Sequence, residues 1–297
     1  MTLESRTDVY ELHMVRGAHA GARADLVIEI PHGATETVDF TRLQDRLTSP
    51  LPEALVDFFH VNTDAGAPEL AEGIAARLVT EDPTRSVAIL RCRIPRTFID
   101  CNRRMDASPA DFKAGKVTPG LMPWITTDED RALLRGLYDG YHQAVRDALS
   151  SSEGAAILML HTYAPRTVDV EVDADIVKNL RRAYLPEVEP TWPLRPEIDV
   201  ISRALDGTNY APAEVVATLK SALAEEGITV ADGLTYPLHP STVAWDHVQA
   251  MPGRALCVEV RRDLLADPFE PFAQMKIGAA KVARLAGPFV SALRRWW

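Results

Sequence analysis

The stretch IEIPHGATE, residues 28–36, joins an apolar strand to a histidine and then to a glutamate. The apolar run Ala24–Ile30 is typical of a strand buried in a sheet, and Pro31 ends it. His32 follows directly, and Glu36 comes four residues later. An imidazole and a carboxylate placed where a core strand ends indicate a candidate functional site.

A second histidine has the same placement. The apolar run AAILML, residues 155–160, is followed by His161. If both strands are parallel, the two imidazoles lie at one edge of the sheet, where open α/β sheets bind ligands. Two histidines, a carboxylate such as Glu36 and an open position form the ligand set of a catalytic zinc site. The competing interpretation is structural, because a histidine after a strand is commonly a satisfied loop residue and the chain has eight histidines.

The alternation of apolar runs and helical periodicity predicts one α/β domain spanning residues 1–297. It would have a mixed, mostly parallel sheet with helices on both faces. We expect strands at Ala24–Ile30, Ser86–Leu90, Ala155–Leu160 and Ala255–Val260. We expect helices at Ala67–Val79, Asp128–Leu149, Ala213–Glu226 and Phe272–Leu293, and a loop at Leu185–Pro196.

Composition narrows the classes of function. The formal net charge is -10 and the sequence pI is about 5.3, which argues against a nucleic-acid partner. The start of the chain lacks the apolar core of a signal peptide, and no apolar run is long enough to span a membrane. The three cysteines form no CxxC pair. These features favour a cytoplasmic protein with reduced thiols.

Glu259 is the candidate general base. In the strand ALCVEV, residues 255–260, alternation places Ala255, Cys257 and Glu259 on one face. A carboxylate within an apolar strand is costly unless it is paired or has a chemical role. The alternative is a buried ion pair with an arginine such as Arg261.

Five arginines lie within RCRIPRTFIDCNRR, residues 91–104, of this acidic chain. Arginine binds carboxylates through two parallel hydrogen bonds, so the segment favours a small anionic substrate. For Arg91 and Arg93 we expect a solvated edge strand instead. Arg103, next to Asn102, is the better candidate for function.

Three further residues carry weaker hypotheses. Tyr236 and His239, in TYPLHPST, precede the strand of Glu259 and could contact substrate, but a turn built on Pro237 and Pro240 is the favoured explanation for either residue alone. Cys101 is a conceivable nucleophile, but a cysteine beside a strand end is usually just buried.

Taken together, five stretches resemble the N-formylglutamate amidohydrolase family, which is similar in fold to the zinc carboxypeptidases and aspartoacylases. They are PHGATE (31–36), TDAGAPELA (63–71), PRTFIDCNRRMD (95–106), LMLHTY (158–163) and CVEVRRDLL (257–265). The resemblance implies one zinc-carboxypeptidase-like domain. It implies that His32, Glu36 and His161 bind Zn²⁺ or another divalent metal and that Glu259 is the general base and acid. It also implies that Asn102 and Arg103 hold the substrate, with Arg96 adding to that pocket.

The chain departs from the family pattern at two points. The family usually has an acid two residues before the second histidine, whereas this chain has Met159. The outer partner that orients His161 must therefore come from elsewhere. The peptidase relatives space their first ligands as HxxE, whereas His32 and Glu36 are spaced as HxxxE, so Glu36 as a ligand follows the amidohydrolase pattern.

The resulting prediction is a metal-dependent amidohydrolase that removes an N-formyl or other N-acyl group from a small carboxylate-bearing substrate. Two alternatives stand beside it. One is a zinc peptidase or pathway-specific amidase that acts on another acyl or nitrogen group. The other is a non-catalytic small-molecule-binding protein of the same fold, which Met159 favours. The terminal SALRRWW, residues 291–297, would support a homodimer if its tryptophans are exposed.

Overall fold

One mixed sheet organises residues 4–297, which are the residues that the computed structural model describes. Its seven strands lie in the order β1-β3-β2-β4-β7-β5-β6. Their bounds are β1 Tyr10–Arg16, β2 Leu26–Ile30, β3 Ser86–Cys92, β4 Ala156–Tyr163, β5 Ile198–Val200, β6 Val230–Asp232 and β7 Ala255–Arg261. The central strands β3, β2, β4 and β7 are parallel to one another. The edge strand β1 and the pair β5 and β6 run the other way. The predicted mixed, mostly parallel sheet is therefore confirmed.

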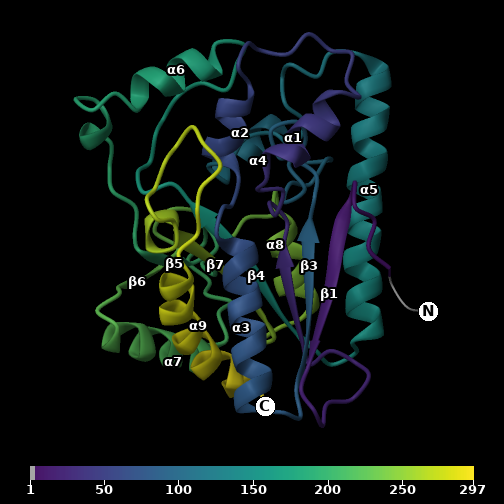
Figure 1. The fold of residues 1–297 in the computed structure, drawn as a ribbon, viewed down its shortest axis with the longest axis vertical. Coiled ribbons are helices and arrows are strands. Elements are labelled where there is room, and N and C mark those ends of the chain that lie inside the picture. The colour runs from purple at the N-terminus through teal and green to yellow at the C-terminus, as the bar shows by residue number, and fades with distance from the viewer. Residues whose placement is uncertain (1–3) are drawn as a thin grey trace.

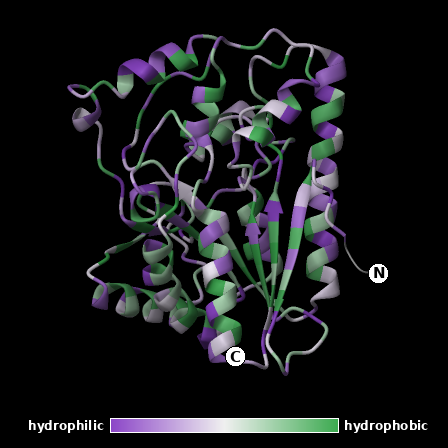
Figure 2. Cartoon of the chain, in the orientation of Figure 1, coloured by the Kyte–Doolittle hydropathy of each residue, from purple (hydrophilic) through white to green (hydrophobic). Residues whose placement is uncertain are grey.

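Helices cover both faces of this sheet, which is why most residues of its central strands are buried and apolar (Figures 1 and 2). One face packs against α3 (Ala67–Glu81), α7 (Ala213–Glu225) and α9 (Ala279–Leu293). The other packs against α5 (Asp128–Ser151) and α8 (Val243–Ala250). In α5, the side chain of Thr127 caps the first turn, and three acidic residues there complement the helix dipole.

Short helices gather beyond the carboxyl ends of β2 and β3, at the top of Figure 1. They are α1 (Thr37–Gln44), α2 (Val56–Asn62), α4 (Pro109–Ala114) and α6 (Ile176–Ala183). Three one-turn 3₁₀ helices, at Glu189–Thr191, Arg262–Leu264 and Arg294–Trp296, complete the secondary structure of the described residues. This end of the sheet is where a parallel α/β fold binds ligands.

The four predicted strands and three of the four predicted helices agree with the structure to within three residues at each end. The fourth helix begins at Ala279 rather than Phe272, because the chain from Phe272 to Gly278 is irregular. The prediction missed β1, whose side chains are partly exposed, and β5 and β6, which have three residues each. Elements so short or so mixed in polarity lack a readable period.

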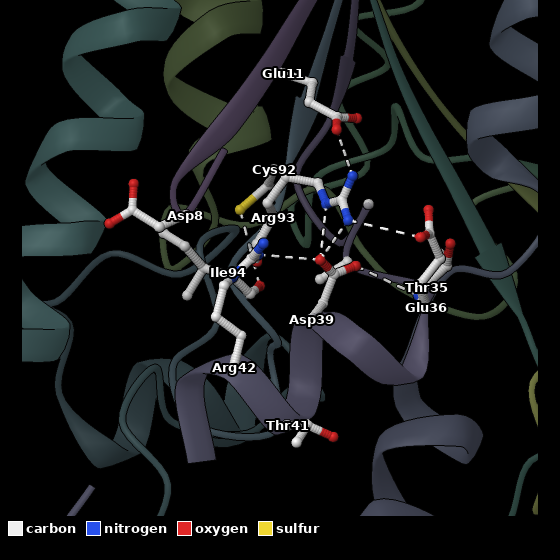
Figure 3. Close-up of polar contacts among 12 residues, drawn as sticks. Asp8, Glu11, Thr35, Glu36, Asp39, Thr41, Arg42, Cys92, Arg93 and Ile94 are labelled. Carbon is white, nitrogen blue, oxygen red and sulfur yellow. Dashed lines mark hydrogen bonds and ion pairs between the residues drawn. The ribbon is translucent and has the colours of Figure 1, made fainter. Parts of the chain in front are cut away.

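The expectation that Arg91 and Arg93 lie on a solvated edge strand is wrong. Both lie at the end of β3, which has β1 on one side and β2 on the other. Arg93 is buried, and its guanidinium contacts the carboxylates of Asp39 and Glu11 (Figure 3). A buried arginine is tolerated at this inner strand because its guanidinium is paired with these carboxylates.

The terminal tryptophans contact the same domain. The indole of Trp296 donates a 2.8 Å hydrogen bond to the carbonyl of Gly253, and the guanidinium of Arg85 lies 4.6 Å from the ring centre of Trp297. A homodimer therefore stays a prediction. Among the described residues, the structure has no helix with the length and apolar character needed to cross a membrane.

Candidate metal centre

Three buried side chains converge at the carboxyl end of the sheet. His32 follows β2, Asp64 precedes α3, and His161 lies within β4. Asp64 Oδ2 lies 3.2 Å from His32 Nδ1 and 3.0 Å from His161 Nδ1. One potential ligand atom from each residue lies within 4.8 Å of the others. Two imidazoles and a carboxylate at these separations can hold one divalent ion and leave a position open.

The local backbone explains how these residues meet. Gly33 permits the close approach after β2, because a Cβ atom there would lie 3.0 Å from the carbonyl oxygen of Cys92. The backbone N–H of Asp64 donates to the carbonyl of His32 at 3.3 Å, which fixes the two loops together. Gly66 then starts α3 with a φ of 92°, a conformation that glycine adopts at little cost.

The other ring nitrogens of the histidines face the loop after β3. His32 Nε2 lies 2.7 Å from Asp100 Oδ1, so Asp100 can accept its proton and leave Nδ1 free as a ligand. His161 Nε2 lies 3.5 Å from the side-chain amide of Asn102. The amide nitrogen of Asn102 is a donor, so in this orientation Nδ1 of His161 carries the proton. Turning the amide of Asn102 by 180° would present its oxygen to Nε2 and free Nδ1 as a ligand.

Burial disfavours ionisation of Asp64, but His32 and His161 outweigh burial and hold the pKa of its carboxyl group well below its usual range. Burial also disfavours ionisation of Asp100. There Arg103, His32 and Arg96 outweigh it, so the pKa of Asp100 is also well below normal. Both carboxylates are therefore charged at neutral pH, as a ligand and its supporting acceptor must be.

The structure does not bring Glu36 to the two imidazoles, which corrects the expected ligand set. Glu36 is the N-cap residue of α1, and 42% of its side chain is exposed. Its carboxylate lies 3.0 Å from Arg91 and 3.7 Å from Arg93 (Figure 3). Because the helix starts directly after it, Glu36 turns toward these arginines, and Asp64 takes the place expected for it.

Glu259 lies beside the cluster. It pairs with His161 in the register of β4 and β7, and its Oε2 is buried without a hydrogen-bond partner among the described residues. Burial raises the pKa of Glu259 to about 7, although His161 acts in the opposite direction. A carboxylate with a pKa near neutrality and a free oxygen is suited to accept and return a proton.

The predicted arginines divide into two groups. All three guanidinium nitrogens of Arg103 face protein oxygens: those of Asp100, the carbonyl of Thr118 and the carbonyl of Asn102. Arg96 donates to Asp100 at 2.8 Å, yet its Nε has no partner in the described part of the chain. Arg103 therefore supports Asp100, whereas Arg96 pairs with Asp100 and keeps a buried Nε–H without a partner among the described residues.

These residues line a cavity of about 1080 Å³. His32, His161, Glu259, Asn102, Arg96 and Arg103 are on its wall, as is Tyr236. So are five further cations that sequence reasoning did not connect with the site: Lys113, Lys116, Arg166, Arg195 and Arg262. Positive charge concentrated in one cavity of an acidic chain attracts an anionic ligand.

Tyr236 and Arg195 form one unit of this wall. The guanidinium of Arg195 donates to the Tyr236 hydroxyl at 3.1 Å and lies 5.0 Å from the ring centre of Tyr163. His239 has a different place. It is buried, and its Nδ1 contacts the hydroxyl and the backbone N–H of Ser241 within its own turn. The turn interpretation thus accounts for His239.

Cys101 is not suited to be a nucleophile. Its side chain is buried, and burial raises the pKa of the thiol well above its usual value. A thiol held in its neutral form reacts slowly.

Sequence reasoning missed Asp64, Asp100 and Arg195. Asp64 and Asp100 stand in the stretches TDAGAPELA and PRTFIDCNRRMD, so their motifs were noticed while their roles were not. An aspartate directly before a helix that follows a histidine-bearing strand was the available signal for Asp64. Arg195 lies in a proline-rich loop whose sequence carries no such signal.

Comparisons with known proteins bear on the family and the fold of this chain. A family model described as N-formylglutamate amidohydrolase matches residues 24–266. An N-formylglutamate amidohydrolase structure from Ralstonia eutropha covers 96% of this chain and 96% of its own, at 19% identity and a TM-score of 0.59. A gene product of Agrobacterium tumefaciens covers 97% and 94%, at 18% identity and a TM-score of 0.53. Both likenesses concern the fold. No curated protein matches the sequence significantly.

Proposed function

The chain belongs to the N-formylglutamate amidohydrolase family, and on that premise we propose that it is a zinc-dependent amidase. It would remove a formyl or another acyl group from the nitrogen of a small carboxylate-bearing substrate. The observation that carries the proposal is the convergence of His32, Asp64 and His161 next to the unpaired carboxylate oxygen of Glu259.

The donor set fits a divalent metal. Two imidazole nitrogens and one carboxylate oxygen are borderline to hard ligands that suit zinc, and Asp100 supports His32. When bound by His32, Asp64 and His161, Zn²⁺ would polarise the amide carbonyl and make water more acidic.

The remaining chemistry belongs to the side chains. Glu259 takes a proton from water as the water oxygen adds to the amide carbon. The C–N bond then breaks, and Glu259 returns the proton to the leaving nitrogen. The guanidinium of Arg96, on the cavity wall, supports the negative charge that develops on the carbonyl oxygen. Arg103 keeps Asp100 charged and in place.

The carboxylate of the substrate has cationic partners on the cavity wall. Arg195 is fixed by Tyr236 and by Thr167, whose hydroxyl accepts from its Nε at 3.1 Å. A guanidinium held in this way loses little freedom when it binds a carboxylate, which favours specificity for acidic substrates.

The test is to measure the metal content of the purified protein and its hydrolysis of N-formyl-L-glutamate, together with the Glu259→Gln variant. We expect near-stoichiometric zinc in both proteins and turnover in the wild type alone. The rate of the variant should fall by at least about 10²-fold, as removal of a general base predicts. A protein that takes up no metal when zinc is supplied, or a variant of undiminished rate, would overturn the proposal.

A further inference from the structure

The cavity is much larger than a formyl amino acid requires. Its volume is about 1080 Å³, whereas pockets of roughly 300–1,000 Å³ hold whole drug-sized molecules. A formyl group is the smallest of all acyl groups. The cavity therefore has room for a ligand group larger than formyl.

One wall of the cavity is apolar. The segment TVDVEV, residues 167–172, is neither helix nor paired strand, yet its polarity alternates. Val168, Val170 and Val172 line the cavity and pack against the neighbouring core, whereas Glu171 is exposed and does not line it. Asp169 is exposed and also borders the cavity. The three valines at alternate positions therefore give this segment an apolar surface toward the cavity, with one carboxylate between them.

Two other elements extend this wall. Phe58 and Val61 of α2 line the same cavity, and α2 contacts α6, to which the valine segment leads. At the rim, Leu194 is 60% exposed and pairs through the backbone with Arg166, just before the segment. An apolar surface that stays open to a cavity gains free energy when an apolar ligand covers it.

Arg195, the cation proposed to bind the carboxylate of the substrate, lies at the opposite end of this wall. Arg195 contacts Thr167, where the valine segment begins, and the valines then lead away from it toward α6. Arg195 also lies beside the end of β7, because Arg261 donates to its carbonyl at 3.1 Å. The leaving amine receives its proton from Glu259 of β7, so the amine and its carboxylate belong on the side of Arg195. The acyl group then extends toward the valines.

We propose that Val168, Val170 and Val172, together with Phe58 and Val61, form a subsite for an aliphatic acyl chain. The substrate class is then N-acyl amino acids with acyl chains of several carbons, in preference to N-formyl compounds. This inference rests on the proposed amidase function, and it assigns the acyl side of the substrate.

The experiment compares kcat/KM of the zinc-loaded protein for the N-formyl, N-acetyl, N-butyryl and N-hexanoyl derivatives of L-glutamate. Each buried methylene contributes about fourfold in affinity, so we expect kcat/KM to rise by up to about that factor per added carbon as far as hexanoyl. Calorimetric titration of the Glu259→Gln variant with N-formyl- and N-hexanoylglutamate gives the same comparison without turnover.

Variants locate the subsite. Val170→Thr keeps the shape of the side chain but replaces one methyl group with a hydroxyl group, and it should lower kcat/KM for the hexanoyl substrate several-fold more than for the acetyl substrate. Glu171→Gln, the outward neighbour in the same segment, is the matched control and should leave the chain-length preference unchanged.

The outcomes separate this inference from the proposed function. Turnover that is fastest with the formyl compound, or equal for all chains, overturns the acyl subsite while the amidase function stands. The acyl subsite is also overturned if kcat/KM depends on acyl chain length but Val170→Thr leaves this dependence unchanged. A third contrary outcome is a kcat/KM that rises with the length of the amino-acid side chain in a series of N-formyl amino acids. Failure to hydrolyse any member of the series overturns the function itself.

Discussion

His161 on β4 and Glu259 on β7 are direct partners in the parallel register, so the candidate ligand and the candidate base lie side by side on one face of the sheet. Asp199 of β5 is the next partner across from Glu259 and is fully buried. Its carboxylate accepts hydrogen bonds from the backbone N–H groups of Leu234 and Thr235, directly before Tyr236. One row of the sheet thus positions the candidate metal ligand, the candidate base and the loop that carries a cavity residue.

The third ligand can be identified by a pair of substitutions. Asp64→Asn should abolish stoichiometric zinc binding, because it removes the negative charge between the two imidazoles. Glu36→Gln should retain zinc, because its carboxylate faces Arg91. Metal analysis after gel filtration measures both. Loss of zinc from the Glu36 variant with retention in the Asp64 variant would restore the ligand set that the sequence suggested.

Asp100 should matter for the metal although it is not a ligand. Asp100→Asn weakens the support of His32 and leaves Arg96 and Arg103 without their shared anion. We expect zinc affinity to fall by about 10- to 100-fold. Competition with a chromophoric chelator measures the affinity. Asp106→Asn, which removes an exposed partner of Arg104, is the control and should leave zinc affinity unchanged.

The ion pair of Glu29 and His247 should make stability depend on pH. Glu29 is buried on β2, 3.0 Å from the ring of His247 on α8, with Tyr141 and His142 of α5 around it. Burial lowers the pKa of His247, but Glu29 outweighs it and raises that pKa above 6.5. Burial raises the pKa of Glu29, but His247 outweighs it and lowers that pKa below 4.5.

The direction of the pH dependence of stability follows from these two pKa shifts. The contribution of His247 to the free energy of unfolding is complete below pH 6.5 and is lost as pH rises through its folded-state pKa. The contribution of Glu29 is lost as pH falls through the folded-state pKa of Glu29. His247→Gln should therefore lower the free energy of unfolding most near pH 6 and less at pH 9, as urea denaturation would measure. His13→Gln, at an exposed histidine, should show no such trend. An equal loss at both pH values would argue against a charged pair.

Arg93 should be a stability residue. Asp39 is fully buried, and its main partner is the guanidinium of Arg93 (Figure 3). Arg93→Gln leaves this carboxylate largely unpaired, which costs about 3–5 kcal/mol of unfolding free energy. Arg42→Gln removes the more exposed partner of the same carboxylate and should cost about 1 kcal/mol or less. Thermal and chemical denaturation measure both, and equal losses would contradict the assignment.

The sequence by itself determined the central strands and three functional side chains. Apolar runs that end at His32 and His161 predict where two parallel strands stop, and alternation within residues 255–260 places Glu259. These features depend on the period of a strand, which is local, so they can be read without the fold.

Only the tertiary structure decided what surrounds these residues. Asp64 and Asp100 come from loops 32 and 68 residues from His32, and Arg195 comes from a proline-rich loop. Their places depend on how β2, β3 and β4 align and on how α3 docks. Glu36 shows the reverse case. It is near His32 in sequence, but α1 begins at Thr37, and the buried charge of Arg93 with its neighbour Arg91 draws Glu36 away from the site. Electrostatic pairing across distant elements, rather than spacing along the chain, decided which carboxylate lies beside the two imidazoles.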